Sequence, residues 1–434
     1  MKREMKAVEG WITKRFDEIG TIFSGSTPST SVRSFWNGEI VWVTPNDLSK
    51  LNTHYLSDSD KRITVKGLDG CSAHLLPAGS IVMSSRAPIG YVAIPTVEFC
   101  TNQGCKSIHL KENFTTEFTY YNILFNIDKV KNLGEGTTFA EISKTALSTV
   151  ELAFPSSKPE QTKIAEILST VDRAIEQTEA LIAKQQRIKT GLMQDLLTRG
   201  IDEHGNLRTE QTHQFKDSPL GRIPVEWEVN TIGEIVQEAI LGITFRGIRT
   251  DNVCPLIKMG NLSWGSLNLD TVEIVDQERD GSDAPQLEYR DFLFNTRNTP
   301  ELVGKTVVWR SEINRATFDN NLLRLRFHES VASPFLNFYM SFGKGKDEVR
   351  ALVTGTTSVA AIYWRNLKSY PFPRPPIAEQ ERTIKVVEDT LRVLDATRAK
   401  LHKLRSLKTA LMQDLLTGKK RITDLLDDTE VTVL

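Results

Sequence analysis

Apolar residues recur at three- and four-residue spacing along two long stretches of this chain, residues 160–198 and 379–417. This spacing is typical of an amphipathic helix whose apolar stripe packs against another helix. Prolines cluster just before each stretch and none occurs within it, so each stretch is predicted to form one uninterrupted helix. Such a helix would be roughly 58 Å long at 1.5 Å per residue. That length exceeds what one domain core can cover.

The two stretches are copies of each other. They lie 219 positions apart without a gap, both open with Glu-Gln, and both end in the heptapeptide LMQDLLT. Because a whole segment of chain lies between them, the chain can run out along one helix and return along the other. We therefore predict an antiparallel coiled coil that acts as a spacer.

The segments outside the helices, residues 11–157 and 227–374, alternate apolar and polar positions and are punctuated by Gly, Pro and Asn. This pattern predicts short strands. Both segments contain, in the same order, an apolar strand, an Arg-containing turn, an Asn-bearing loop and a Gly-Thr-Thr triplet (136–138 and 355–357). The segments are therefore predicted to be two related domains, and the paired threonines are expected to make shared backbone or partner contacts.

The predicted fold class is α+β, with two related mixed α/β domains separated by two long helices. The helices have kept identical ends while the domains have diverged, which favours one shared task for the helices and different targets for the domains. Drift of loops without selection explains part of this divergence. The predicted divisions are a first domain, a helix, a linker, a second domain, a helix and a tail, at residues 1–157, 158–198, 199–226, 227–374, 375–417 and 418–434.

Composition is that of a globular protein, with 39% apolar and 25% charged residues among 434. No secretory signal or long apolar run is visible, so we expect a cytoplasmic protein without a membrane span. Four cysteines without CxxC spacing predict neither a disulfide nor a zinc site. The net charge of −1 lacks the basic excess of a protein that grips DNA unaided.

Motifs for catalysis are missing from the sequence. There is no GxGxxG after a strand, no FxGxG loop and no N/D-P-P-Y/F motif. Gly304, Lys305 and Thr306 resemble the end of a phosphate-binding loop, but Thr299 stands where its first glycine belongs. The seven histidines are scattered and form no local partnership with an acid or a nucleophile. We therefore expect a non-catalytic chain.

Three features together resemble a known family: the linker FKDSPLGRIPVEWEV at 215–229, the proline-rich segment with Glu-Gln at each helix start, and the LMQDLLT helix ends. They resemble the DNA-specificity subunit of type I restriction-modification systems, over nearly the whole chain. The resemblance implies a prokaryotic protein in which each domain is a target-recognition domain for one half of a bipartite double-stranded DNA sequence. The helices would set the spacing and dock methyltransferase subunits.

The same resemblance implies two methyltransferase subunits and up to two restriction/translocase subunits as partners. Those subunits would carry S-adenosylmethionine, ATP and Mg²⁺, and this chain would carry no cofactor. The alternative is a non-catalytic interaction scaffold with two ligand-binding domains on a coiled-coil spacer, which the near-zero charge favours and the linker and helix motifs oppose. A single-chain nuclease or methyltransferase is a third possibility, which the missing motifs oppose.

Base readout requires side chains that bond base edges, chiefly Arg to guanine and Asn or Gln to adenine, on loops held by a rigid frame. The glycine or turn settings of Arg86, Arg246 and Arg297 favour these three. For each candidate the alternative is structural, since turn Asn and Ser usually bond their own backbone and surface Arg is usually solvated. The candidates are Ser24, Ser26, Thr27, Asn46, Arg86, Asn102 and Gln103 in the first domain and Thr244, Arg246, Arg249, Asn261, Arg297, Asn298, Asn320 and Asn321 in the second.

Partner docking is expected to use side chains that both helices share away from the apolar stripe. Helix capping and local packing are the alternative reading of the same identities. The candidates are Gln161, Lys189, Thr190, Met193, Gln194 and Asp195 in the first copy and Gln380, Lys408, Thr409, Met412, Gln413 and Asp414 in the second.

Overall fold

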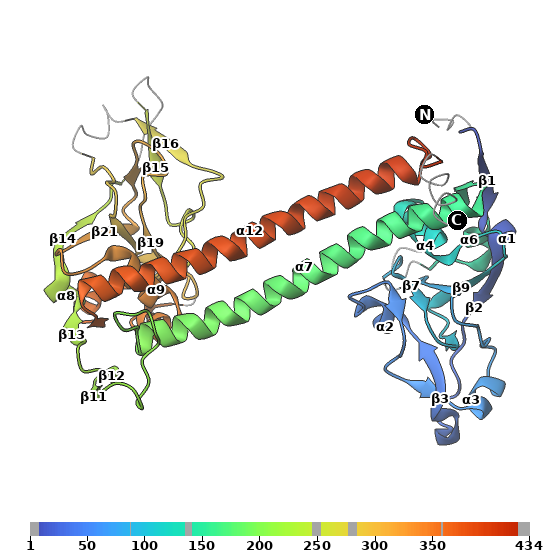
Figure 1. The fold of residues 1–434 in the computed structure, drawn as a ribbon, viewed down its shortest axis with the longest axis horizontal. Coiled ribbons are helices and arrows are strands. Elements are labelled where there is room, and N and C mark those ends of the chain that lie inside the picture. The colour runs from blue at the N-terminus through green and yellow to red at the C-terminus, as the bar shows by residue number, and fades with distance from the viewer. Residues whose placement is uncertain are drawn as a thin grey trace, which may run out of the picture. The chain divides into compact units, whose positions relative to one another are not determined.

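The computed structural model describes residues 8–86, 88–134, 141–244, 253–276, 284–356 and 359–423 (Figure 1). The chain forms two compact units, Met1–Ile182 with Thr397–Leu434, and Ala183–Ala396. Each unit contains one globular domain together with part of both long helices. The boundary between the units falls inside the helices, so the predicted domain limits at 157 and 374 stay a prediction.

The two long helices are α7 (Lys158–Thr198) and α12 (Ile377–Leu415), drawn in green and red in Figure 1. In the first unit Asp172 of α7 lies 2.6 Å from the Lys408 ammonium of α12, and Glu179 accepts a hydrogen bond of 2.6 Å from Arg405. Partner numbers fall along α12 as they rise along α7, so the helices are antiparallel. The predicted α+β class with an antiparallel helix pair is confirmed.

The first domain is built on a five-stranded sheet and a three-stranded sheet. The five-stranded sheet has the order β2 (Gly20–Ser24), β9 (Cys105–Leu110), β6 (Ile81–Ser84), β7 (Val92–Pro95), β4 (Tyr55–Leu56). The three-stranded sheet has the order β5 (Arg62–Ile63), β3 (Trp36–Val43), β8 (Phe99–Thr101), and β1 (Trp11–Arg15) pairs with β10 (Glu151–Pro155). Its short helices are α1 (Phe16–Ile19), η1 (Arg33–Phe35), α2 (Pro45–Ser49), α3 (Val65–Asp69), α4 (Thr116–Phe125), α5 (Ile127–Lys131) and α6 (Lys144–Ser148).

The second domain repeats this plan. A four-stranded sheet has the order β14 (Val236–Leu241), β21 (Leu322–Phe327), β17 (Phe292–Asn295), β19 (Thr306–Val308). Three-stranded sheets have the orders β16 (Glu273–Asp276), β15 (Val253–Ile257), β20 (Thr317–Phe318) and β18 (Arg297–Asn298), β23 (Ala360–Ala361), β22 (Thr354–Gly355). The paired strands are β11 (Phe215–Ser218) with β12 (Gly221–Pro224) and β13 (Glu228–Thr231) with β24 (Pro371–Arg374), and the helices are α8 (Ile232–Ile235), α9 (Ser333–Ser341), α10 (Gly343–Ala351) and α11 (Trp364–Leu367).

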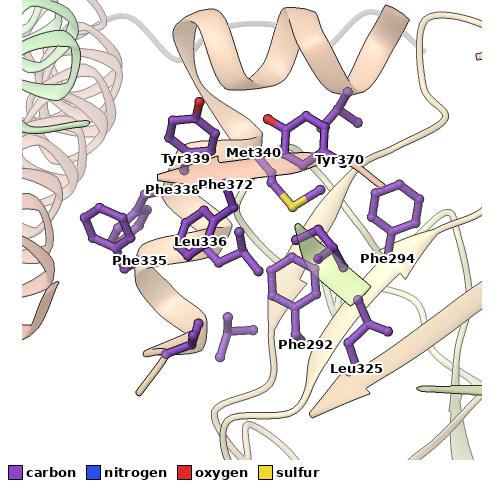
Figure 2. Close-up of a cluster of buried hydrophobic side chains, with 14 of the residues drawn as sticks. Phe292, Phe294, Leu325, Phe335, Leu336, Phe338, Tyr339, Met340, Tyr370 and Phe372 are labelled. Atoms are coloured by element: carbon purple, nitrogen blue, oxygen red, sulfur yellow. The ribbon is translucent and has the colours of Figure 1, made fainter. Parts of the chain in front are cut away.

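The core of the second domain lies between β17 and α9. Figure 2 shows Phe292 and Phe294 of β17 beside Leu336 and Met340 of α9, with Phe372 of β24 nearby. Every residue of α9 is buried, and each large side chain removed from water contributes roughly 1.5–3 kcal/mol. The same cluster includes residues of α7 and α12, so the domain and the helix segments of this unit share one core.

The start of each long helix is held by a buried carboxylate. Glu379 of α12 accepts hydrogen bonds from Arg208 (3.0 Å from Nη2), Trp227 (3.2 Å) and the Ile201 amide (3.1 Å). At the equivalent position of α7, Glu160 accepts two hydrogen bonds from Arg421, of 2.7 and 2.8 Å. A buried charge must be paired to be tolerated. The segments that follow the two helices therefore make the same kind of ion pair.

Neither a membrane-spanning helix nor a metal-binding cluster occurs among the described residues. None of the helices there has both the length and the apolar character that a bilayer requires. In the same ranges no three His, Cys, Asp or Glu side chains are grouped so as to hold a metal ion. The four cysteines are free thiols.

Candidate nucleic-acid interface

A tight turn follows β8 in the first domain. The Asn102 amide donates to the Val43 carbonyl (3.0 Å), and the Asn102 side-chain oxygen accepts a hydrogen bond from the Gly104 amide (2.9 Å). The Gly104 carbonyl in turn accepts from the Ser85 amide (2.8 Å). The Asn102 side chain therefore closes its own turn, as turn asparagines commonly do, and the turn displays the exposed Gln103.

The second domain builds the same turn with other residues. The Asp319 amide donates to the Ile257 carbonyl (3.0 Å), its side chain accepts from the Asn321 amide (3.1 Å), and the Asn321 carbonyl accepts from the Thr296 amide (2.8 Å). Burial raises the pKa of the Asp319 carboxyl above its usual value. Asp319 is therefore the counterpart of Asn102 in the first domain, and the half-buried Asn320 takes the place of Gln103.

Each turn is joined to the loop after the first strand of its sheet by a threonine. The Thr27 hydroxyl donates to the Gln103 side-chain oxygen over 2.5 Å. The Asn320 side-chain amide donates to the Thr244 hydroxyl over 3.0 Å. Because an amide can make about four hydrogen bonds, each amide keeps further donors and acceptors for another contact. Four of the predicted base-reading residues thus form two equivalent pairs.

An arginine stands beside each pair. Ser85 in the first domain and Thr296 in the second each accept, through the backbone carbonyl, a hydrogen bond of 3.0 Å from an isoleucine amide, Ile142 or Ile362. In both domains the next residue after the acceptor is an arginine. The two arginines therefore occupy the same place in the two domains.

Arg86, the arginine of the first domain, lies in a cluster of charges. Its guanidinium is 3.6 Å from the Glu141 carboxylate, and the ammonium of buried Lys106 is 3.5 Å from the same carboxylate. A Cβ atom added to Gly104 would lie 3.2 Å from Arg86 Nε, so glycine leaves the room that this side chain uses beside the turn. One carboxylate thus serves two cations.

Arg297, the arginine of the second domain, faces no such carboxylate. Its ladder partner is Ala361, in the place where Arg86 has Glu141. The Arg297 side chain is exposed, and within the described residues its guanidinium has neither an ion pair nor a hydrogen bond. It is therefore more available than Arg86 for a contact outside the chain.

A pocket of about 310 Å³ opens beside Arg297 and Asn320. Leu241, Tyr363 and Trp364 line it and are 56%, 48% and 37% exposed. None of the three is among the residues predicted from the sequence. Tyr363 and Trp364 are adjacent aromatic residues after a short strand, and Leu241 is an apolar residue at the end of a strand; such residues are more often core. Aligning Ile362 of the second domain with Ile142 of the first could have shown that Tyr363 follows the strand and does not belong to it.

The other candidates of the first domain lie in the same loops with polar partners of their own. Ser24 is exposed at the end of β2. The Ser26 carbonyl accepts a hydrogen bond of 3.0 Å from the Trp42 indole, and the Asn46 side chain donates to Asp60 over 3.1 Å. Base contact by these three residues stays a prediction.

In the second domain Asn298 and Asn321 both bond locally. Asn298 donates to the Asn295 side chain over 3.0 Å, and Asn321 donates to the Asp319 side chain over 3.2 Å. Both are half-buried, so their role as base readers also stays a prediction. Two further candidates lie outside the described residues, Arg246 and Arg249.

Asn261 does not fit the prediction of base contact. It is buried, its side-chain oxygen accepts from the Lys258 amide (2.9 Å), and its amide donates to the Asn268 and Thr271 carbonyls (3.0 and 2.8 Å). In the first domain Asp47 closes the equivalent loop in the same way. Asn261 therefore fastens a loop, because its hydrogen-bonding groups are already used inside the domain.

Residues 8–185 match the family described as the type I restriction modification DNA specificity domain. The type I restriction enzyme MjaIX specificity subunit of Methanocaldococcus jannaschii is 35% identical over 236 residues, which are 54% of this chain and 53% of that protein. The match thus spans about half of that relative. The putative MjaX specificity subunit of the same organism is 27% identical over 403 residues, 85% of this chain and 86% of that one.

Residues 8–185 thus match the family's DNA specificity domain, and the chain is similar to type I restriction-modification specificity subunits. The crystal structure of the S subunit from M. genitalium has a TM-score of 0.58 with 17% identity, over 96% of this chain and 97% of that one. A likeness at this identity shows a shared fold. The family resemblance of the linker and helix motifs is therefore confirmed.

The glutamines that open the two helices of this specificity-subunit fold are buried. Gln161 accepts a hydrogen bond from the Thr115 amide over 3.0 Å, and Gln380 accepts from the Ala332 amide over 2.8 Å. Both also donate to the carbonyl of a proline just before their own helix. Their side chains are buried and tie the helix start to its own domain, which supports the alternative reading of capping and local packing; partner contact by these two residues stays a prediction.

The shared lysines of the specificity-subunit helices also contact their own domains. The Lys189 ammonium lies 4.5 Å from the centre of the Phe342 ring. The Lys408 ammonium lies 5.7 Å from the centre of the Tyr121 ring and 2.6 Å from Asp172. A cation over an aromatic face is a favourable contact. Contacts inside the chain therefore explain why both helices have a lysine at this position.

The shared methionines point toward the cores. Met193 is buried in the core of the second unit, which supports internal packing as the reason for its identity, and its partner contact stays a prediction. Met412 is half-buried and packs against the core of the first unit. Internal packing therefore accounts for part of the sequence identity between the ends of the two helices. The shared candidates that are exposed are Thr190, Gln194, Thr409 and Gln413.

Another exposed feature that both helices share was missed. Ile188 and Leu407 occupy equivalent positions and are 53% and 48% exposed. One turn on in each helix stands a small exposed residue, Gly191 or Ala410. Lysines precede them and aspartates follow them at helical spacing. We call this surface the shared stripe, and its residues are Lys184, Ile188, Gly191, Asp195, Lys403, Leu407, Ala410 and Asp414.

The threonine triplets are only partly described. Gly136, Thr137, Thr138 and Thr357 lie outside the described residues. The Thr356 amide donates to the Val359 carbonyl over 3.0 Å, which is a backbone contact within the turn between β22 and β23. The shared contacts expected of these threonines stay a prediction.

Proposed function

We propose that this chain is the DNA sequence-specificity subunit of a type I restriction-modification complex, in which each domain reads one half of a bipartite double-stranded target. The observation that carries the proposal is the repeated arrangement of threonine, side-chain amide and arginine. The same backbone hydrogen bonds build it in both domains, while the surrounding side chains differ. A constant frame with variable side chains is what readers of two different half-sites require.

The residues on this frame have the chemistry of base readout. Arginine can bond guanine and a side-chain amide can bond adenine in the major groove. The long helices set the spacing between the half-sites in this proposal. Because the net charge is only −1, neighbouring subunits supply part of the phosphate contacts.

The partners in this proposal are two methyltransferase subunits and up to two restriction/translocase subunits in a prokaryotic cytoplasm. These subunits carry S-adenosylmethionine, ATP and Mg²⁺, and this chain is without catalysis or cofactor. The shared stripe supports the count of two, because each helix presents it once, as a lysine, an exposed large apolar residue, a small residue and an aspartate in equivalent positions. Each copy docks one methyltransferase subunit.

Mapping of methylated adenine across a genome tests the proposal. Cells express the matching methyltransferase subunit with or without this chain. A bipartite motif should appear only when the chain is present, and exchanging residues 11–157 for those of a relative should change one half alone. An active methyltransferase in a stable complex that shows no motif would refute the proposal and favour the scaffold.

A further inference from the structure

Equivalent positions around the turn and the arginine carry apolar side chains in the second domain and polar ones in the first. In the second domain Leu241, Tyr363 and Trp364 form apolar walls of the 310 Å³ pocket, and Arg297 and Asn320 stand at the same pocket. Three large apolar side chains that are more than a third exposed are thus gathered around one hollow. Exposed apolar groups concentrated at a hollow mark a binding site more often than scattered ones do.

The counterparts of these walls in the first domain are polar. Strand register pairs Ser24 with Lys106 in the first domain and Leu241 with Leu323 in the second. After the equivalent isoleucines, the first domain has Ser143 and Lys144 where the second domain has Tyr363 and Trp364. The pocket is therefore a property of the second domain, where it replaces a polar surface.

We propose that this pocket receives the C5-methyl edge of a thymine in the major groove, so that the half-site read by the second domain contains an A·T pair at that position. The inference rests on the proposed function. The thymine methyl is the apolar group that base edges present in the major groove, and apolar side chains are its usual readers. The side chains of Arg297 and Asn320 then lie beside the methyl, where they can bond the neighbouring bases.

Deoxyuridine provides a direct test, because it differs from thymidine only by that methyl group. The purified complex of this chain with its methyltransferase subunits is bound to duplexes that carry the mapped motif. Each thymidine of the motif is replaced in turn by deoxyuridine. One replacement in the second domain's half should raise Kd about fourfold, equivalent to about 0.8 kcal/mol for one buried methyl group.

Variants connect this effect with the pocket. Complexes with Tyr363→Ala or Trp364→Ala should bind the thymidine and deoxyuridine duplexes equally. Two controls should keep the difference: Tyr289→Ala, an exposed aromatic residue of the same domain that does not line this pocket, and Ser143→Ala at the equivalent place in the first domain.

The possible outcomes separate this inference from the function on which it rests. A complex that keeps its bipartite preference but is insensitive to every deoxyuridine in that half overturns the thymine pocket alone. Sensitivity that survives both pocket variants overturns it too, as does loss of subunit assembly by those variants, which would make the pocket a seat for a partner protein. A complex with no sequence preference in either half refutes the proposed function itself.

Discussion

Arg86 and Arg297 show how one position can carry different chemistry in the two domains. Both follow an equivalent strand and both stand beside a side-chain amide. Arg86 shares Glu141 with Lys106, whereas Arg297 is opposite Ala361. An ion pair must be given up or rearranged before Arg86 can turn to a base. Arg297 has no ion pair to give up within the part of the chain that the structure describes.

Substitution of each arginine should therefore act on one half-site only. Arg297→Ala should relax base selectivity at one position of the second domain's half by about 1–3 kcal/mol, the usual worth of a bidentate base contact. Arg86→Ala should act on the other half. Methylome mapping of both variants measures the effect, and each serves as the control for the other. A change in both halves, or in neither, would contradict these roles.

Asp319, which closes the turn beside Arg297, makes the stability of the folded protein depend on pH. Burial raises the pKa of its carboxyl, so between the ordinary value of 3.8 and the raised one the folded protein binds more protons than the unfolded chain. The Asp319 contribution to stability therefore falls as the pH rises through this window. Its counterpart in the first domain is Asn102, which closes the same turn without a charge.

Asp319→Asn should remove this pH dependence while it keeps the turn, because the asparagine oxygen can still accept from the Asn321 amide. Thermal unfolding of wild type and variant across acidic and neutral pH measures it. The variant should be the more stable at neutral pH, and its advantage should shrink as the pH falls. Parallel curves across the whole range would show that the Asp319 carboxyl is not the group responsible.

At the scale of elements, the buried carboxylates at the helix starts hold each helix to its domain. Glu379 binds Arg208, Trp227 and a backbone amide in the interior of the second unit. Removal of one partner of a buried ion pair leaves the other charged group without compensation, at a cost of about 3–5 kcal/mol. The largest loss of stability is therefore expected when only one of the two residues, Glu379 or Arg208, is replaced.

Glu379→Ala should destabilise the chain by about 3–5 kcal/mol. Glu381→Ala, two residues further along the same helix and exposed, should change stability by no more than about 0.5 kcal/mol. Denaturant unfolding of both variants, with and without the methyltransferase subunits bound, provides the comparison. Equal stability of the two variants would mean that Arg208 finds another partner.

The helices and their direction could be predicted because periodic apolar residues, prolines and an exact duplication all point the same way. The sequence pattern also predicted that both domains consist mainly of short strands. The shared order of motifs in the two domains placed Thr27, Gln103, Thr244 and Asn320 in loops that could read bases. Burial was not predictable for polar residues. Asn261, Gln161 and Gln380 read as exposed polar groups from the sequence. The backbone amides that bind Gln161 and Gln380 come from segments distant in sequence, whereas Asn261 is bonded within its own loop, whose closure the sequence pattern does not show.

Identity between the helices was likewise a mixed signal. A repeat preserves residues that pack internally as readily as residues that bind a partner, and periodicity does not say what covers a polar position. The exposed apolar pair Ile188 and Leu407 could be recognised only once their exposure was known. The aromatic walls of the second domain's pocket were missed for the related reason that aromatic side chains are more often core.

At the scale of the whole molecule, the duplication presents the shared stripe, the proposed docking surface, twice. Ile188 and Leu407 hold the same place in the two copies of the shared stripe, each next to a small residue and flanked by a lysine and an aspartate. A surface repeated on both helices can bind two copies of one partner, whereas the diverged domains cannot. The number of methyltransferase subunits should therefore respond to each stripe separately.

Ile188→Glu should leave one methyltransferase subunit bound instead of two, and so should Leu407→Glu, because burying an unpaired carboxylate against an apolar partner surface costs at least about 2 kcal/mol. The double variant should bind none. Native mass spectrometry of the purified complexes counts the subunits directly. Val393→Glu is the matched control, since Val393 is also an exposed apolar residue of α12 but has Ala174 as its counterpart and lies outside the shared stripe. If either single variant lost both subunits, the two stripes would have to act as one surface, and if the double variant kept both, docking would lie elsewhere on the chain.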